Sequence, residues 1–239
     1  MKAIILAGGK GERLKNIIND IPKPMAPIAG KPFLEYLVLQ LGSWDIKDII
    51  LSVGYRKESI ISYFTDGSKW DLNIIYVPED LPLGTGGAVK NAEKMINSSP
   101  ILVMNGDSFC PLDLNKFIGF HRQKKALASI ALAESDDTKD YGKIVLDSSE
   151  RIMKFSEKSE GTGKSFINTG IYLFEKEVFS MIPPDSKCSL EYDIFPKLVG
   201  KAFYGFSTNE MLMDIGTPER YQYAKRYFEA RSSSVNLKE

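Results

Sequence analysis

The first 14 residues, MKAIILAGGKGERL, constrain the fold more than any other stretch of this chain. Residues 2–7 hold an apolar run that is too short for an isolated helix and is typical of a buried strand. The glycines that follow let the backbone adopt positive φ angles and direct its N–H groups toward an anion. Lys10 and Arg13 add positive charge to this loop. The sequence therefore predicts a strand that runs into a phosphate-binding loop.

The spacing of the glycines separates this loop from two other phosphate-binding loops. A dinucleotide-binding fingerprint needs a glycine three residues beyond Gly11, where Leu14 stands. A Walker loop needs Gly-Lys-Ser/Thr after four intervening residues, a pattern that does not occur. The chain has G-G-x-G-x-R-L, followed ten residues after Arg13 by Lys23 in a P-K-P stretch whose prolines predict a stiff, extended segment. A tight strand-to-helix turn with solvated charges is the alternative interpretation of the glycines alone.

The overall composition argues against several classes of protein. The 239 residues carry 31 basic and 31 acidic side chains, so we expect no broad charged surface that binds nucleic acid or a membrane. Cys110 and Cys188 lie far apart without metal-ligand spacing, which argues against a disulfide framework and a zinc site. No apolar stretch reaches membrane-spanning length and no cleavage signal is present, so we expect a cytoplasmic protein.

Strands and helices are predicted to alternate along the first half of the chain. Strands are expected at 2–7, 48–53, 73–77, 100–104 and 127–133, and helices at 33–41, 58–64, 88–96, 114–125, 190–199 and 219–230. This pattern predicts an α/β fold with a Rossmann-like, mainly parallel sheet flanked by helices. Short strands separated by turns follow residue 140. We expect one domain over 1–230, with halves at 1–135 and 136–230, and a C-terminal tail at 231–239.

The glycine loop and the P-K-P stretch together resemble the signature of sugar-1-phosphate nucleotidyltransferases, L-A-G-G-x-G-x-R-L followed by P-K-P. The resemblance covers about residues 1–227, with the motifs in the family's order. It implies a GT-A-like fold in which 1–135 mainly binds the nucleotide and 136–230 mainly binds the sugar phosphate. It also implies that Arg13 and Lys23 are catalytic. The loop residues implied to bind the nucleotide are Leu6, Ala7, Gly8, Gly9, Lys10 and Gly11.

The stretch PEDLPLGTGGA at 78–88 holds three glycines in four positions, a composition poorly suited to a core element. It resembles the E-E-P-L-G-T-A-G segment of guanylyltransferases, which implies that Glu79, Gly84 and Thr85 bind the nucleotide. Guanine offers two adjacent N–H donors, which match the two acceptor oxygens of a carboxylate. Uracil and thymine place one donor between two carbonyls, which suits an amide and repels a carboxylate. Asp80 is the alternative base-binding residue, and a solvated acidic loop is the alternative without function.

Two aspartates are expected at strand ends. Asp107 ends an N-G-D sequence that resembles the family's metal motif, and Asp214 begins a D-I-G-T-P sequence that resembles its D-x-G-T-P motif. The resemblance implies that both bind Mg²⁺, a hard cation that prefers oxygen ligands, and that Asp107 is also catalytic. Without the resemblance, Asn-Gly-Asp is ordinary turn chemistry and Thr-Pro is an ordinary helix start.

Three short sequences in the second half resemble the family's Y-G, F-x-E-K and N-x-G elements. The resemblance implies that Lys158 pairs with the sugar phosphate, that Glu157 and Asn168 bind hydroxyls, and that Gly170 admits the sugar ring. A Glu-Lys pair is also common on any solvated strand edge. The residues implied at the sugar phosphate are Asn105, Tyr141, Gly142, Glu157, Lys158, Asn168 and Gly170.

The resemblance thus implies transfer of GMP from GTP to a sugar 1-phosphate, with Mg²⁺ as cofactor. D-glycero-D-manno-heptose 1-phosphate guanylyltransferases are the most similar group, ahead of mannose 1-phosphate guanylyltransferases and then of uridylyl- and thymidylyltransferases. A non-catalytic nucleotide-binding regulatory module is the alternative from another class, and it predicts loss of Lys23 or of a metal aspartate, all of which are present. We expect no nucleic-acid or membrane partner, and the sequence leaves a homo-oligomer open.

Overall fold

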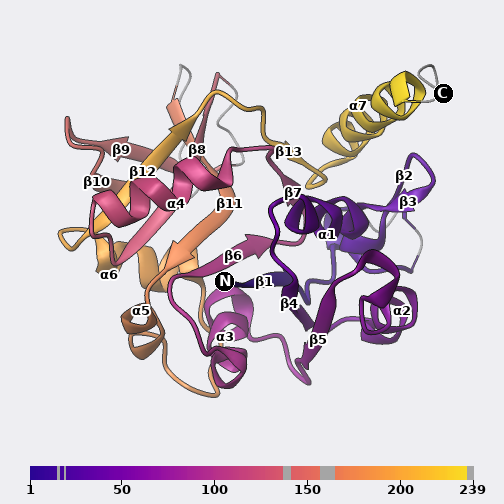
Figure 1. Cartoon of the computed structure of the whole chain (residues 1–239), viewed down its shortest axis with the longest axis horizontal. Coiled ribbons are helices and arrows are strands. Elements are labelled where there is room, and N and C mark those ends of the chain that lie inside the picture. Colours follow the sequence, from indigo (N-terminus) through magenta and orange to yellow (C-terminus); the bar gives the residue numbers. More distant parts are fainter. Residues whose placement is uncertain (15–16, 19, 137–140, 157–164, 236–239) are drawn as a thin grey trace.

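The computed structural model describes residues 1–14, 17–18, 20–136, 141–156 and 165–235, and Figure 1 shows how its elements are arranged. Strand β1 (Lys2–Ala7) lies between β4 (Asp48–Val53) and β6 (Ile101–Asn105), and β5 (Asn73–Pro78) lies beside β4. These four strands are parallel, and Leu6 is aligned with Ser52 of β4 and with Asn105 of β6. The segments that follow β1, β4 and β6 therefore emerge side by side.

Strand β11 (Ser165–Phe174) connects the two halves of the chain within one sheet. It pairs antiparallel with β6 near its end and with β9 (Lys143–Leu146) near its start, while β8 (Ala128–Ser135) runs along its other side. Strand β12 (Phe203–Thr208) is parallel to β8, and β10 (Ile152–Ser156) is antiparallel to β9. Within the described residues this sheet has nine strands. The predicted α/β class with a mainly parallel sheet is confirmed, and its antiparallel strands gather in the second half.

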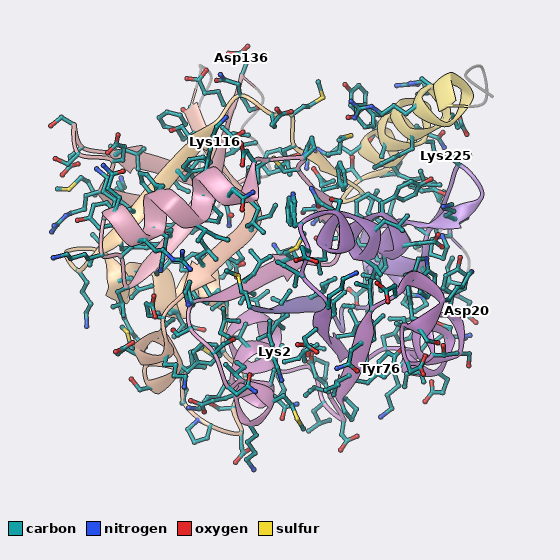
Figure 2. All side chains as sticks on the ribbon, in the orientation of Figure 1. Lys2, Asp20, Tyr76, Lys116, Asp136 and Lys225 are labelled. Atoms are coloured by element: carbon teal, nitrogen blue, oxygen red, sulfur yellow. The ribbon has the colours of Figure 1, made fainter. Side chains whose placement is uncertain are left out.

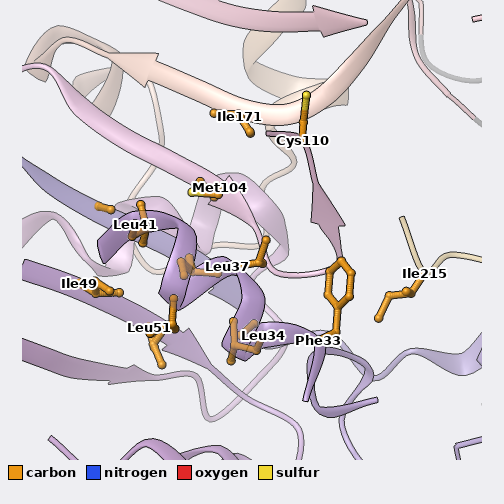
Figure 3. Close-up of a cluster of buried hydrophobic side chains, with 14 of the residues drawn as sticks. Phe33, Leu34, Leu37, Leu41, Ile49, Leu51, Met104, Cys110, Ile171 and Ile215 are labelled. Atoms are coloured by element: carbon orange, nitrogen blue, oxygen red, sulfur yellow. The ribbon is translucent and has the colours of Figure 1, made fainter. Parts of the chain in front are cut away.

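Helices cover both faces of this sheet. They are α1 (Phe33–Ser43), α2 (Lys57–Phe64), α3 (Gly84–Asn91), α4 (Leu114–Gln123), α5 (Lys176–Ser180), α6 (Phe195–Leu198) and α7 (Pro218–Val235). Successive side chains of a strand point to opposite faces, so Ile5 belongs to one buried cluster and Ile4 to the other. Figure 3 shows the first cluster, to which α1 contributes Leu37 and Leu41 and β4 contributes Ile49.

Four predicted elements differ from those observed. Helix α3 begins at Gly84 rather than at 88. Lys23 begins a 3-10 turn rather than lying in an extended segment, because the Met25 N–H donates to the Pro22 carbonyl at 2.8 Å. The predicted helix at 190–199 is a π-helix (Leu190–Ile194) followed by α6. The tail predicted from 231 is wrong up to Val235, because α7 continues to that residue.

Several short elements lack the length that produces a periodic pattern. The two-residue strands are β2 (Pro27–Ile28), β3 (Lys31–Pro32), β7 (Ser108–Phe109) and β13 (Met213–Asp214), and the 3-10 turns are Glu12–Leu14, Lys23–Met25, Ser68–Trp70 and Glu93–Met95. Strand β13 pairs antiparallel with β7 and attaches the chain before α7 to the end of β6. Strand β13 includes the strand end expected at Asp214, and the turn at Glu93–Met95 lies in the helix predicted at 88–96, whereas the other short elements were not predicted.

Charged side chains of both signs are spread over the molecule, as Asp20, Lys116, Asp136 and Lys225 illustrate in Figure 2. Opposite charges form exposed pairs, such as Lys47 with Asp71 at 2.7 Å. In the part of the chain that the structure describes, every helix is too short or too polar to cross a membrane.

Candidate active site

The glycine loop after β1 packs tightly against two other segments. A Cβ on Gly11, whose φ is +66°, would lie 2.6 Å from the Cβ of Lys23. A Cβ on Gly54 would lie 2.8 Å from the carbonyl oxygen of Gly8, which accepts a hydrogen bond from the Tyr55 N–H at 3.2 Å. Glycine at position 11 therefore lets the Lys23 side chain lie directly on the loop. Sequence analysis missed Gly54, although its place immediately after a buried strand was an available signal.

Lys23 and Asp107 form an ion pair at the carboxyl ends of β1 and β6. The Lys23 Nζ lies 2.5 Å from the Asp107 Oδ2, and the Lys23 side chain is 11% exposed. Partial burial raises the pKa of Asp107, but the charges of Lys23 and Arg13 and the hydrogen bonds from Lys23 and Ser108 outweigh it and hold that pKa below its usual range. Asp107 is therefore a carboxylate at neutral pH.

Two neighbouring cavities open around this ion pair. The first has a volume of about 290 Å³ and the second about 170 Å³. Lys23, Asn105 and Asp107 line both cavities. The first is also lined by Leu6, Gly8, Gly9, Pro24, Glu79, Pro82, Gly84, Thr85 and Ala88. The second is also lined by Arg13, Ser108, Tyr141, Gly142, Asn168, Gly170, Glu191, Tyr192, Asp214, Gly216 and Arg220.

The cavities bring together most of the predicted site residues. Those predicted at the nucleotide gather around the first cavity, and those predicted at the sugar phosphate gather around the second. Ala7 is buried in β1, and Lys10 and Gly11 line neither of these cavities. Glu157 and Lys158 lie outside the described residues. The individual roles of these residues remain predictions.

Glu79 directly follows β5, at the carboxyl end of that strand, and lines the first cavity. Its Oε1 accepts a hydrogen bond from the Ser52 hydroxyl at 2.9 Å, and its Oε2 accepts one from the Leu83 N–H at 3.1 Å. These contacts fix the orientation of the carboxylate, and each oxygen keeps a second lone pair for a ligand. The alternative residue Asp80 has a side chain that is 98% exposed and lies 3.6 Å from Lys57. Asp80 does not line the first cavity.

The glycines at the start of α3 make room for a close contact within the chain. A Cβ on Gly84 would lie 2.6 Å from the Cys188 carbonyl oxygen, and one on Gly87 would lie 2.7 Å from the Ser186 carbonyl oxygen. The N–H groups of Gly86 and Gly87 donate to the Cys188 carbonyl at 2.9 and 3.1 Å. The glycines therefore let the segment before the π-helix lie against the first turn of α3.

Asp214 lies beside Asp107 because β13 pairs with β7. Asp214 is opposite Ser108 in this ladder, and the Ile215 N–H donates to the Asp107 carbonyl at 3.1 Å. Among the described residues, no group of three or more His, Cys, Asp and Glu side chains is placed to hold a metal. Two carboxylates at one cavity nevertheless fit Mg²⁺, which usually binds one or two carboxylates and completes its coordination with phosphate oxygens and water.

The Asp214 carboxylate is surrounded by donors and is 8% exposed. Its Oδ1 accepts a hydrogen bond from the Gly216 N–H at 2.6 Å, and its Oδ2 accepts one from the Tyr141 hydroxyl. The Arg220 Nη1 lies 3.6 Å from Oδ2, and the Arg220 guanidinium lies 4.2 Å from the centre of the Tyr141 ring. Sequence analysis missed Arg220, and the signal was its place in the first turn of the helix after D-I-G-T-P.

Gly170→Ala is expected to destabilise the protein and to disturb the site. Gly170 has a φ of +78°, and a Cβ there would lie 2.9 Å from the Asn105 Nδ2. The left-handed conformation alone costs about 1–2 kcal/mol for alanine, which corresponds to a Tm lower by about 2–8 °C. Displacement of Asn105, which lines both cavities, should also lower kcat.

Gly119→Ala is the control for this change. Gly119 lies in α4 and a Cβ there has no atom within 4 Å, so alanine should raise stability by about 0.5–1 kcal/mol. Thermal unfolding and steady-state kinetics of both variants test the prediction. A Gly170→Ala protein with the Tm and kcat of the wild type would contradict it.

Comparison with known proteins gives consistent similarities. A sequence model of the family described as Nucleotidyl transferase matches residues 2–231. The D-glycero-alpha-D-manno-heptose 1-phosphate guanylyltransferase of Aneurinibacillus thermoaerophilus is 38% identical over 95% of this chain and 97% of its own length. The Mannose-1-phosphate guanylyltransferase of Mycobacterium tuberculosis is 36% identical over 92% of this chain, which spans 62% of its length. The crystal structure of HddC from Yersinia pseudotuberculosis complexed with GMP-PN has a TM-score of 0.84 at 38% identity, covering 95% of this chain and 99% of that one.

Proposed function

We propose that this chain, which belongs to the nucleotidyl transferase family, transfers GMP from GTP to a sugar 1-phosphate and releases pyrophosphate. The family predicted from the glycine loop and the P-K-P stretch is confirmed. The observation that carries the proposed reaction is the meeting of two cavities at Lys23, Asn105 and Asp107. The larger cavity suits a nucleoside, and the smaller one contains the cations Arg13 and Arg220, which suit a phosphate.

In the proposed reaction a phosphate oxygen of the sugar 1-phosphate attacks the α-phosphorus of GTP. A new P–O bond forms, and the bond from that phosphorus to the pyrophosphate oxygen breaks. The attacking phosphate monoester is mostly dianionic at pH 7, with a second pKa of about 6, so it needs no protein base. The protein then has to position both substrates and to stabilise negative charge. The Lys23 ammonium lies where the substrates would meet and is suited to this role.

We propose that Asp107 and Asp214 hold Mg²⁺ together with the substrate phosphates. When bound, the ion would neutralise phosphate charge during the transfer. The contact with Lys23 keeps Asp107 ionised, so its carboxylate can pair with the Lys23 ammonium and bind Mg²⁺ as well. Asp214 is fixed by Gly216 and Tyr141.

We propose D-glycero-α-D-manno-heptose 1-phosphate as the acceptor. The support is 38% identity over nearly the full length of the Aneurinibacillus heptose enzyme. Mannose 1-phosphate is the alternative, because the Mycobacterium mannose enzyme is 36% identical. The lack of nucleic-acid and membrane partners remains a prediction from the balanced charge of the sequence, and a cytoplasmic location remains a prediction from its apolar pattern. The oligomeric state remains open.

A product assay tests this function. The protein is incubated with Mg²⁺, with GTP, UTP or dTTP, and with either the heptose 1-phosphate or α-D-mannose 1-phosphate. Anion-exchange chromatography with mass spectrometry detects the nucleotide-sugar, and a coupled assay detects pyrophosphate. We expect GDP-heptose as the main product. Preference for UTP or dTTP would overturn the guanylyl assignment, and absence of every product would favour the regulatory module.

Glu79→Gln is expected to lower kcat/KM for GTP by about ten- to a hundredfold, since hydrogen bonds to a charged group contribute roughly 1.5–3 kcal/mol. The amide loses one acceptor for the two guanine donors but suits the pyrimidine edge, so the preference for GTP over UTP and dTTP should narrow. Asp80→Asn is the control, because that side chain is exposed and does not line the first cavity. If Glu79→Gln keeps its GTP preference while Asp80→Asn loses it, Asp80 is the residue that binds the base.

A further inference from the structure

A carboxylate that sequence analysis assigned no function lies on the wall of the second cavity. Glu191 belongs to the π-helix and is half-buried. Its Oε2 accepts hydrogen bonds from the Thr85 hydroxyl at 2.6 Å and from the Ser189 hydroxyl at 2.8 Å. The Thr85 hydroxyl in turn accepts one from the Leu190 N–H at 2.8 Å. The directions of these hydrogen bonds are therefore fixed, and the carboxylate is held in one orientation.

The second oxygen of this carboxylate is available to a ligand. Among the described residues, no hydrogen-bond donor contacts the Glu191 Oε1, and this atom is not enclosed by protein. An ionised carboxylate is an acceptor and repels a phosphate, so the ligand group that it suits is a hydroxyl. The cations of the same cavity, Arg13, Lys23 and Arg220, suit the phosphate instead.

The contact between Glu191 and Thr85 also joins the two cavities. Thr85 lies in the first turn of α3 and lines the first cavity, whereas Glu191 lines the second. The side-chain hydroxyl of Thr85 is occupied by Glu191 and the Leu190 N–H, which leaves it little capacity to bind a nucleotide. Thr85 was expected at the nucleotide from the resemblance, and its side chain contacts the π-helix of the opposite wall.

We propose that Glu191 binds a hydroxyl of the sugar 1-phosphate and that Thr85 is a positioning residue that orients Glu191 for this contact. The proposal rests on the proposed function, because it assigns a role in the acceptor site of that reaction. It makes a residue of the nucleotide-side helix a determinant of sugar affinity. A carboxylate already fixed by two hydroxyl donors loses little freedom when the sugar binds, which favours tight and specific recognition.

The test measures KM for each substrate at saturating concentration of the other. With the sugar 1-phosphate that the wild type uses, heptose or mannose, Glu191→Gln should raise the sugar KM about tenfold or more, and the KM for the nucleoside triphosphate should stay within about twofold. Thr85→Val should raise the sugar KM by a smaller factor, and Thr85→Ser, which keeps the hydroxyl, should restore most of the loss.

Asp193→Asn is the matched control. Asp193 lies on the same π-helix and accepts a hydrogen bond from the Ser189 N–H at 2.7 Å, but it does not line the second cavity. Its substitution should leave the sugar KM unchanged. The proposal would be overturned if Glu191→Gln and Asp193→Asn raised the sugar KM equally. It would also be overturned if Glu191→Gln raised the KM values of both substrates equally, because Glu191 would then have only a structural role.

Deoxy analogues of the sugar 1-phosphate give a second measurement. The KM difference between wild type and Glu191→Gln should disappear for the analogue that lacks the contacted hydroxyl, and its persistence with every monodeoxy analogue would contradict the contact. The assays use whichever triphosphate the wild type accepts. Preference for UTP would therefore overturn the guanylyl assignment and still leave the role of Glu191 testable.

Discussion

Lys23→Ala is expected to lower kcat by about 10²–10³-fold while changing the KM for GTP far less. The Lys23 ammonium lies 2.5 Å from the Asp107 Oδ2 and its side chain is 11% exposed, so it is held in place before substrate binds. A charge fixed where the two cavities meet acts mainly on charge that develops in the transition state. Such an interaction appears in kcat and kcat/KM together, and steady-state kinetics measure both.

Lys57→Ala is the matched control for the loss of a paired lysine. Lys57 lies 3.6 Å from the exposed Asp80 and lines neither of the two cavities, so its removal should leave kcat unchanged. A wild-type kcat for Lys23→Ala would remove Lys23 from the reaction. An effect limited to the KM for GTP would make it a residue of ground-state binding.

Asp107→Asn is expected to lower kcat by roughly a thousandfold or more, because a bound metal supplies several kcal/mol of charge stabilisation and this change removes its ligand. The same change also leaves Lys23 without its partner. The pKa of Asp107 lies below its usual range, so the wild-type carboxylate is charged at the pH of the assay. Asparagine keeps the shape of the side chain and loses that charge. The rate is measured as a function of Mg²⁺ concentration.

Asp113→Asn is the control for this substitution. Asp113 caps α4, where its side chain accepts a hydrogen bond from the Lys116 N–H at 3.1 Å, and asparagine caps helices equally well. Its kcat and Tm should match those of the wild type. Asp214→Asn should act in the same direction as Asp107→Asn. Unchanged Mg²⁺ dependence in either variant would exclude that aspartate from the metal site.

The strands of the first half could be predicted because their sequences are apolar on both faces. Residues 48–53 were predicted as a strand and form β4 with the same bounds. A strand covered by helices on both faces shows a continuous apolar run, and the clusters on the two sides of β1 confirm this arrangement. Strands of two residues, such as β7 and β13, give no such pattern and depend on pairing with each other.

The helix boundaries that were predicted wrongly depend on contacts between segments that are distant in the sequence. Glycine has a low helix propensity, so 84–87 was predicted to precede the helix. The structure begins α3 at Gly84 because the N–H groups of Gly86 and Gly87 donate to the Cys188 carbonyl, a partner about 100 residues away in the sequence. The π-helix is fixed similarly, since Thr85 contacts Leu190 and Glu191. Local propensity carries no information about these partners.

The sequence by itself determined the sheet class, the glycine loop and the chemical types of residue at the site. It determined these because apolar periodicity, glycine spacing and charge are properties of short segments. Only the tertiary structure decided which of those residues meet. Lys23 and Asp107 are 84 positions apart, and they pair because β1 and β6 are neighbours and Gly11 leaves space for the lysine side chain. Arg220 and Glu191 reach the second cavity in the same way, through contacts between elements that are distant in the chain.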